Sequence, residues 1–210
     1  MHKDVSFDVA AAIAAVKPKL TVPAPASGQP RLVMLSGLPG TGKSTLAREL
    51  ARRLPAVMVE SDQVRQVLFP PPSYSAEESR RVHQICHILI GWYLRHYYHV
   101  IYDATNLYEF QRRLVYRLAE RSGARLVVIR VIASERVIRA RLAPRHRAEL
   151  APDPGEDYSD ADWQVYLNMR RRAEPIQHEH LTLDTSQGDI QGAVEAAVRA
   201  IRVSKQKEGD

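Results

Sequence analysis

A glycine-rich segment at residues 37–44 constrains the fold of this chain more than any other part of its sequence. The segment reads Gly-Leu-Pro-Gly-Thr-Gly-Lys-Ser and matches the pattern G-x-x-x-x-G-K-S/T at every fixed position. Glycines permit backbone turns that other residues resist, so the amide groups can point inward around a phosphate. An apolar run at residues 32–36 precedes the segment and a helical pattern at residues 44–54 follows it. This context predicts a strand, a phosphate-binding loop and a helix in succession.

The residue types in this loop predict how a nucleotide binds. The positive end of the following helix attracts phosphate, and Lys43 supplies a cation for the β- and γ-phosphates. The hydroxyl of Ser44 suits Mg²⁺, so we expect ATP and Mg²⁺ as cofactors. The residues predicted to contact the nucleotide are Gly37, Pro39, Gly40, Thr41, Gly42, Lys43, Ser44 and Thr45.

The rest of the chain alternates between strand-like and helix-like segments. Strands are predicted at residues 56–60, 99–103, 125–132 and 181–184, and helices at residues 62–69, 75–96, 108–122, 135–142, 159–173 and 189–203. Such alternation predicts an α/β fold with a parallel sheet covered on both faces. Ligands of these folds bind at the carboxyl ends of the strands.

The two ends of the chain differ from the segment between them. Residues 5–16 form a helical pattern, and several prolines between residues 18 and 30 predict a linker or a surface strap. We therefore expect a helix and Pro-rich linker over residues 1–30, a P-loop domain over residues 31–203, and a disordered tail over residues 204–210.

The composition is that of a soluble globular protein. Of the 210 residues, 45% are hydrophobic and 26% are charged, and no apolar run approaches the roughly 18 residues of a membrane span. Cys86 is the only cysteine, which excludes an intrachain disulfide. We expect a cytoplasmic protein with no membrane association and no obligate protein partner. The net charge of +6 favours anionic partners such as nucleotides or nucleic acid.

Acidic residues follow the second and third predicted strands. Asp62 lies where a carboxylate can accept the proton of an attacking hydroxyl, and Arg65 falls on the same helical face, where it can hold an anionic acceptor. The alternative is a helix cap with a salt-bridge partner. Asp103 ends the third strand and can hold a Mg²⁺-bound water, whereas Thr105 and Asn106 can cap the next helix.

An arginine cluster follows the fourth predicted strand. Its members are Arg136, Arg139, Arg141, Arg145 and Arg147. Arginines above an active site can neutralise the charge that builds on a transferring phosphoryl group. This position predicts a lid, and the alternative is a solvated basic helix face.

Two histidines, His83 and His87, are spaced four residues apart on the helix predicted at residues 75–96. That spacing suits a metal pair, but the neighbouring sequence offers no third and fourth ligand. The aromatic residues at the end of the same helix can stack on a base, although such residues more often belong to the core.

These motifs together resemble the P-loop kinase family that includes the 5′-hydroxyl polynucleotide kinases, with zeta-toxin and chloramphenicol phosphotransferase kinases as relatives. The resemblance implies a three-layer P-loop NTPase sandwich, a five-stranded parallel sheet of order 2-3-1-4-5, and an Arg-rich lid. It implies that Asp62 is the general base, that Arg65 lies near the acceptor phosphate, and that two lid arginines four apart contact the γ-phosphate. Arg141 and Arg145 match that spacing best. Motifs and resemblance together predict Lys43, Asp62, Arg65, Asp103, Arg141 and Arg145 as catalytic residues, and Ser44 and Asp103 as metal ligands.

Three functions are compatible with the sequence. The first is an ATP-dependent phosphotransferase whose acceptor is the 5′-hydroxyl of RNA or DNA. The second keeps the chemistry and changes the acceptor to a small molecule such as a nucleoside, sugar or antibiotic. The third is a nucleotide-dependent switch or interaction module with little transferase activity.

Overall fold

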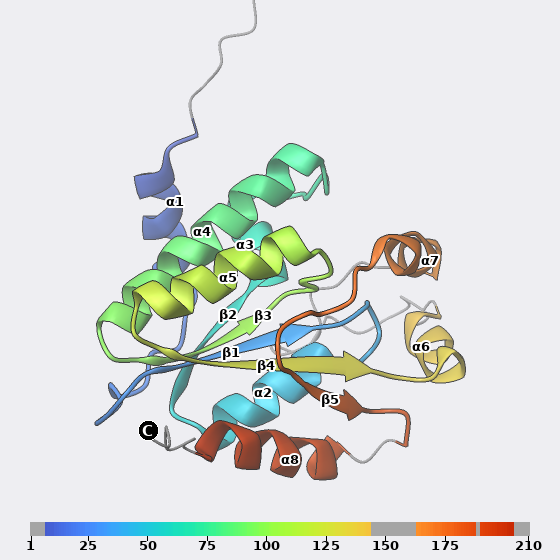
Figure 1. Cartoon of the computed structure of the whole chain (residues 1–210). Helices are drawn as coiled ribbons and strands as arrows, with labels where there is room; N and C mark the ends of the chain where they lie inside the picture. Colours follow the sequence, from blue (N-terminus) through green and yellow to red (C-terminus); the bar gives the residue numbers. More distant parts are fainter. Residues whose placement is uncertain (1–6, 144–162, 188–189, 204–210) are drawn as a thin grey trace, which may run out of the picture.

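The protein is built on one five-stranded parallel sheet (Figure 1). The computed structural model describes residues 7–143, 163–187 and 190–203. The strands are β1 (Arg31–Ser36), β2 (Ala56–Glu60), β3 (His99–Asp103), β4 (Arg125–Ile132) and β5 (Leu181–Asp184). They lie in the order β2-β3-β1-β4-β5, so the predicted α/β fold and strand order are confirmed.

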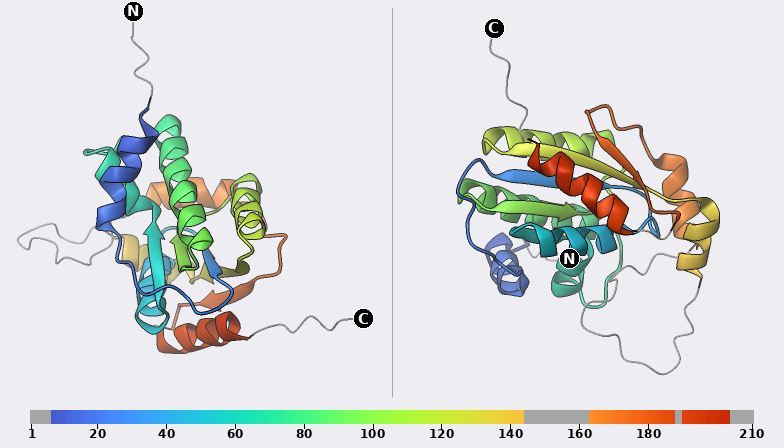
Figure 2. Two further views of the ribbon diagram at one scale, coloured as in Figure 1. Left: turned by 90° about the vertical axis from the view of Figure 1, so that its left-hand side faces the viewer. Right: turned by 90° about the horizontal axis from the view of Figure 1, so that it is seen from below.

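Helices cover both faces of the sheet. They are α1 (Val9–Val16), the short 3-10 helix η1 (Lys17–Lys19), α2 (Lys43–Arg53), α3 (Ser61–Leu68), α4 (Ala76–Arg95), α5 (Glu109–Arg121), α6 (Glu135–Leu142), α7 (Trp163–Arg172) and α8 (Ile190–Arg202). Helices α1, α3, α4 and α5 lie on one face, and α2 and α8 lie on the other (Figures 1 and 2). Helices α6 and α7 lie beyond the carboxyl ends of the strands.

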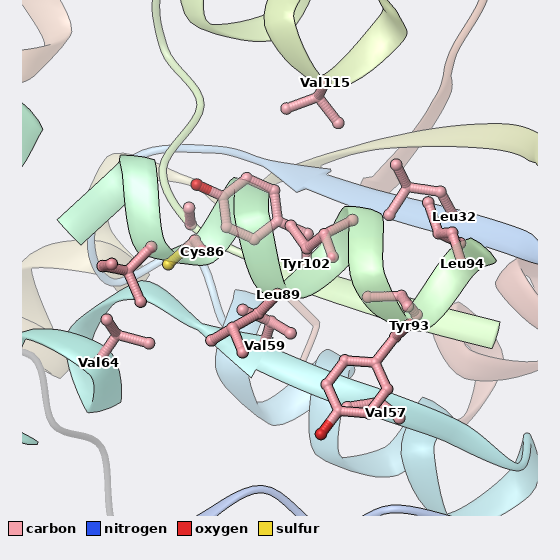
Figure 3. Packing of buried hydrophobic residues seen from close by; sticks show 14 of the residues in the cluster. Leu32, Val57, Val59, Val64, Cys86, Leu89, Tyr93, Leu94, Tyr102 and Val115 are labelled. Carbon is pink, nitrogen blue, oxygen red and sulfur yellow. The ribbon is translucent and has the colours of Figure 1, made fainter. Parts of the chain in front are cut away.

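The sheet separates two hydrophobic cores, because alternate residues of a strand point to opposite faces. In β1, Leu32 and Met34 belong to the core beneath α3, α4 and α5, whereas Val33 and Leu35 belong to the core beneath α2 and α8. Figure 3 shows the first core, in which side chains of α4 pack against residues of β1, β2 and β3.

The N-terminal segment contributes to the first core. Ala12, Val16 and Leu20 are buried in the same cluster as Val64 of α3 and Val82 of α4. The predicted helix at residues 5–16 is present as α1, and the division of the chain into an appendage and a domain stays a prediction. The predicted tail at residues 204–210 lies outside the described residues, as does the start of the helix predicted at residues 159–173.

No helix within the described residues is both long enough and apolar enough to cross a bilayer.

We expect the packing of α1 to contribute measurably to stability. Val16 is 1% exposed, so Val16→Ala removes buried methyl groups and should lower the free energy of unfolding by about 1–3 kcal/mol. Val22 is 44% exposed, and Val22→Ala is the matched control, with an expected change near zero. Urea denaturation measures both variants. Equal stability of the two would show that α1 does not pack as described.

Candidate active site

The phosphate loop joins the end of β1 to the start of α2. Gly40 (φ 76°) and Gly42 (φ 86°) adopt the left-handed conformation that favours glycine. A Cβ atom on Gly37 would lie 2.4 Å from the carbonyl oxygen of Val131, so β4 leaves no room for a larger residue there. The loop therefore needs glycine at these positions for conformational and steric reasons.

Hydrogen bonds within the loop close it on itself. The hydroxyl of Thr41 donates to the carbonyl of Leu38 (2.8 Å), and Nζ of Lys43 donates to the same carbonyl (2.9 Å). Lys43 is 8% exposed, and Pro39 is also buried. Ser44 is half-buried and Thr45 is exposed in the first turn of α2. The contacts of these residues with a nucleotide stay a prediction.

The loop after β3 is bonded to the phosphate loop. The amide of Gly37 donates to the carbonyl of Thr105 (3.0 Å). Asn106 is 1% exposed, and its side-chain amide donates to the carbonyl of Leu35 (2.7 Å). The Ser36 hydroxyl donates to the main-chain carbonyl of Asn106 (3.0 Å). Asn106 thus joins β1 to β3, and the interpretation of Asn106 as a helix cap is wrong, because the N-cap of α5 is Tyr108.

Asp103 lies at the carboxyl end of β3 in a position suited to a metal site. Asp103 is 3% exposed. In the pairing of β2 with β3 it lies opposite Glu60, which is also buried. The carboxylate of Asp103 and the hydroxyl of Ser44 are oxygen donors of the kind that Mg²⁺ prefers. This donor chemistry fits the metal role predicted for the two residues, and the role stays a prediction.

Helix α3 carries Asp62 and Arg65, the two residues predicted for the acceptor side. Asp62 is half-buried in the first turn, and the N-cap of α3 is Glu60, so the interpretation of Asp62 as a helix cap is wrong. Arg65 is 7% exposed and donates from Nη1 to the Glu78 carboxylate (2.5 Å). The Arg65 guanidinium lies 4.9 Å from the ring centroid of Tyr74.

Glu78 is a residue of this site that the sequence analysis missed. Its carboxylate accepts hydrogen bonds from the amide and hydroxyl of Ser73 (2.7 and 2.6 Å) as well as from Arg65. Burial raises the pKa of Glu78, but the Ser73 hydrogen bonds and Arg65 outweigh it and lower the pKa to about 2. The pattern Ser-x-x-Glu predicts only a cap, and Ser75 does accept from the amide of Glu78 (3.2 Å). Nothing in the sequence pairs Glu78 with Arg65.

Arg141 of α6 reaches the outer side of the phosphate loop. It donates from Nη1 to the carbonyl of Gly40 (3.1 Å) and to the hydroxyl of Thr185 (3.0 Å), and from Nη2 to the Thr185 carbonyl (2.9 Å). The Thr185 hydroxyl donates to the carbonyl of Thr41 (2.8 Å). Three segments therefore meet here, namely α6, the phosphate loop and the residues after β5.

The γ-phosphate contact of Arg141 stays a prediction. Arg145 and Arg147 lie outside the described residues. Of the other predicted lid arginines, Arg136 is exposed, and Arg139 is exposed with its guanidinium 5.4 Å from the ring centroid of Trp163 in α7.

His83 and His87 face β3 rather than a metal centre. Nδ1 of His83 lies 2.8 Å from the Tyr102 hydroxyl, and the His87 ring meets the Tyr102 ring edge-on at 5.8 Å. Burial lowers the pKa of both histidines to about 4, with Arg65 adding to the effect at His83. Within the part of the chain that the structure describes, no group of three or more His, Cys, Asp or Glu residues could hold a metal ion.

The sheet order and the phosphate loop together define a P-loop nucleotide-binding protein with the fold of the P-loop kinases. A family model described as an AAA domain matches residues 32–176. The chain therefore belongs to this family of AAA domains.

Similarity to kinases extends to sequences and to solved structures. The adenylyl-sulfate kinase of Myxococcus xanthus is 34% identical over 118 residues, in a match that covers 52% of this chain and 62% of that protein. The adenylyl-sulfate (APS) kinase CysC of Mycobacterium tuberculosis, solved with AMPPNP and APS, has a TM-score of 0.60 at 14% identity, covering 83% of this chain and 99% of the other. A sugar kinase from Janibacter has a TM-score of 0.57 at 14% identity, with coverage of 83% and 96%.

We expect Gly37→Ala to weaken ATP binding. The added Cβ would collide with the main chain of β4, so the entrance of the loop must shift. An affinity loss of roughly tenfold or more corresponds to about 1.4 kcal/mol. Calorimetric titration with ATP and Mg²⁺ measures it, and Gly28→Ala is the control because a Cβ there meets nothing within 4 Å. An unchanged affinity in Gly37→Ala would contradict the described packing.

The low pKa of Glu78 predicts a pH dependence of stability. In the unfolded chain Glu78 binds a proton near its ordinary pKa of 4.5, whereas in the folded protein it does so only near 2. Its stabilising contribution is therefore complete above about pH 4.5 and is lost as the pH falls toward about 2. Glu78→Gln should lose less stability than the wild type between about pH 5 and about pH 3.

Urea denaturation at both pH values tests this expectation. Glu77→Gln is the matched control, because the neighbouring Glu77 side chain is 50% exposed and should leave the wild-type pH dependence nearly intact. The same loss of stability in the wild type and in Glu78→Gln would rule out the ionised pair as the cause.

Proposed function

We propose that this protein is an ATP-dependent kinase that transfers the γ-phosphoryl group to a hydroxyl of a small molecule. The observation that carries the proposal is the convergence of three strand ends at one edge of the sheet. The phosphate loop follows β1, Asp62 and Arg65 follow β2, and Asp103 ends β3 between them. This arrangement supports the proposal, because a phosphate-binding element and a carboxylate suited to act as a base both follow carboxyl ends of parallel strands, with one strand between them.

A small acceptor is favoured over a polynucleotide by the charges on the acceptor side. Proteins hold a polynucleotide largely through basic residues that contact its phosphates. Here Arg65 is buried and its charge is balanced by Glu78, and the neighbouring Asp62 adds negative charge. The similar proteins also include an adenylyl-sulfate kinase and a sugar kinase. A kinase that phosphorylates the 5′-hydroxyl of a polynucleotide is thus the second candidate function.

The proposed reaction assigns a step to each side chain. Asp62 accepts the proton of the acceptor hydroxyl as that oxygen attacks the γ-phosphorus, and the bond to the β–γ bridging oxygen breaks to release ADP. Lys43 balances the charge on the phosphoryl oxygens, and Arg65 orients the acceptor. Ser44 and Asp103 would hold Mg²⁺, which neutralises phosphate charge when bound.

Asp62→Asn tests the central step. The amide cannot accept the proton, so we expect kcat to fall about 10²- to 10⁴-fold while ATP affinity changes by less than about twofold. Transfer from radiolabelled ATP is measured with adenylyl sulfate, nucleosides, sugars and a 5′-hydroxyl oligonucleotide. Glu120→Gln, at an exposed position of α5, is the control.

The outcomes separate the candidate functions. Full transfer by Asp62→Asn would remove Asp62 from its role as base. Labelling of the oligonucleotide alone would restore the polynucleotide acceptor. Hydrolysis of ATP that no acceptor changes would favour the nucleotide-dependent switch.

A further inference from the structure

Arg112 of α5 is a fully buried arginine that lies outside the predicted catalytic residues. Its side chain is 0% exposed, and all three guanidinium nitrogens donate hydrogen bonds. Nε donates to the Glu109 carboxylate (2.8 Å), which also balances the charge. Burying a guanidinium costs free energy unless it is paired and hydrogen-bonded. Loss of any partner of Arg112 would therefore destabilise the folded protein.

The remaining donors of Arg112 join two segments that are far apart in the sequence. Nη1 donates to the carbonyl of Asn106 (3.0 Å) in the loop after β3. Nη2 donates to the carbonyls of Glu174 (3.1 Å) and Pro175 (2.6 Å), which follow α7. Two further bonds join the same segments, from the amide of Glu109 to the Glu174 carboxylate (2.6 Å) and from the amide of Glu174 to the carbonyl of Leu107 (3.0 Å).

The first of these segments is bonded directly to the phosphate loop. The Asn106 carbonyl that accepts from Arg112 also accepts from the Ser36 hydroxyl, one residue before Gly37. Asn106 has a φ of 45°, a left-handed conformation that non-glycine residues rarely adopt. Such a conformation persists where the surroundings over-determine it, as the bonds from Ser36 and Arg112 do here.

We propose that Arg112 is a positioning residue for the nucleotide site, which holds the Asn106 carbonyl and thereby fixes the entrance of the phosphate loop and the residues after Asp103. The proposal rests on the proposed function in that the phosphate loop binds ATP. It adds that Arg112 links the segment after α7 to the Asn106 carbonyl, which is bonded to the start of that loop. Arg112 touches no reacting atom, so its effect must pass through Asn106 and Ser36.

The test compares two neighbouring arginines on α5. Arg112→Met removes every bond of the guanidinium, while Arg112→Lys keeps the charge beside Glu109 but has fewer donors in a different geometry. Arg113→Met is the matched control, because Arg113 also pairs with Glu109 (3.6 Å) but has a side chain that is 63% exposed. Ser36→Ala removes a bond to the same Asn106 carbonyl without leaving a buried charge unpaired.

We expect Arg112→Met to weaken ATP binding on the order of tenfold to a hundredfold, as small displacements of a positioned site do. Arg112→Lys should recover part of that loss, Ser36→Ala should show a smaller loss, and Arg113→Met should match the wild type. Calorimetric titration with ATP and Mg²⁺ gives these affinities at a temperature where circular dichroism shows each variant folded. Where an acceptor is known, its KM should change by less than about twofold.

Unchanged ATP affinity in folded Arg112→Lys and Ser36→Ala would overturn the proposal, even if both melt at a lower temperature, because Arg112 would then only stabilise the fold. If Arg112→Met does not fold, the Lys and Ser36 variants alone decide. Because the titration needs no acceptor, failure to find phosphoryl transfer would leave this test intact.

Discussion

The pairing of β1 with β3 on one side and with β4 on the other is the constraint on which the site depends. Met34 lies in register between Tyr102 and Val128, so the strand that leads into the phosphate loop is bonded along both edges. The carbonyl of Val131 then lies so close to Gly37 that a side chain cannot fit. Direct bonds from Ser36 and Gly37 to the loop after β3 complete this environment. The geometry of the phosphate loop is therefore set by the strands around it as much as by its own glycines.

The proposed acceptor side, formed by α3 and α4, depends on electrostatics rather than on strand pairing. Burying the Arg65 guanidinium without a partner would cost free energy. The Glu78 carboxylate balances its charge, and Ser73 donates two hydrogen bonds to that carboxylate. This arrangement fixes the guanidinium beside Tyr74 and adds no net charge to the site. An acceptor would then be distinguished by shape and by directed hydrogen bonds more than by attraction to a basic surface.

Local sequence predicted the elements well, because their signals lie within a few residues. The phosphate loop, the strands β2, β3 and β4 and the helix α6 have the bounds that the apolar patterns and glycines indicated. The strand order came from the resemblance to a kinase family and is confirmed.

Interactions between residues that are far apart in the sequence were not predicted. Arg65 and Glu78 are separated by 13 residues, and Arg141 and Thr185 by 44, with no pattern that links either pair. Asn106 was interpreted as a helix cap because its residue type suits that role, yet tertiary contacts with β1 use the same amide. The burial of α1 was missed for a similar reason, since prolines after a helix indicate a linker but not what the helix packs against.

The division of the core by the sheet has a consequence for how such a protein can diverge. Helix α2, which follows the phosphate loop, rests on one core, whereas α3 and α4, which carry Asp62, Arg65 and Glu78, rest on the other. The strands of the sheet lie between these two cores. A lineage can therefore change the surroundings of Asp62, Arg65 and Glu78 by substitutions under α3 and α4 that leave the core beneath α2 intact.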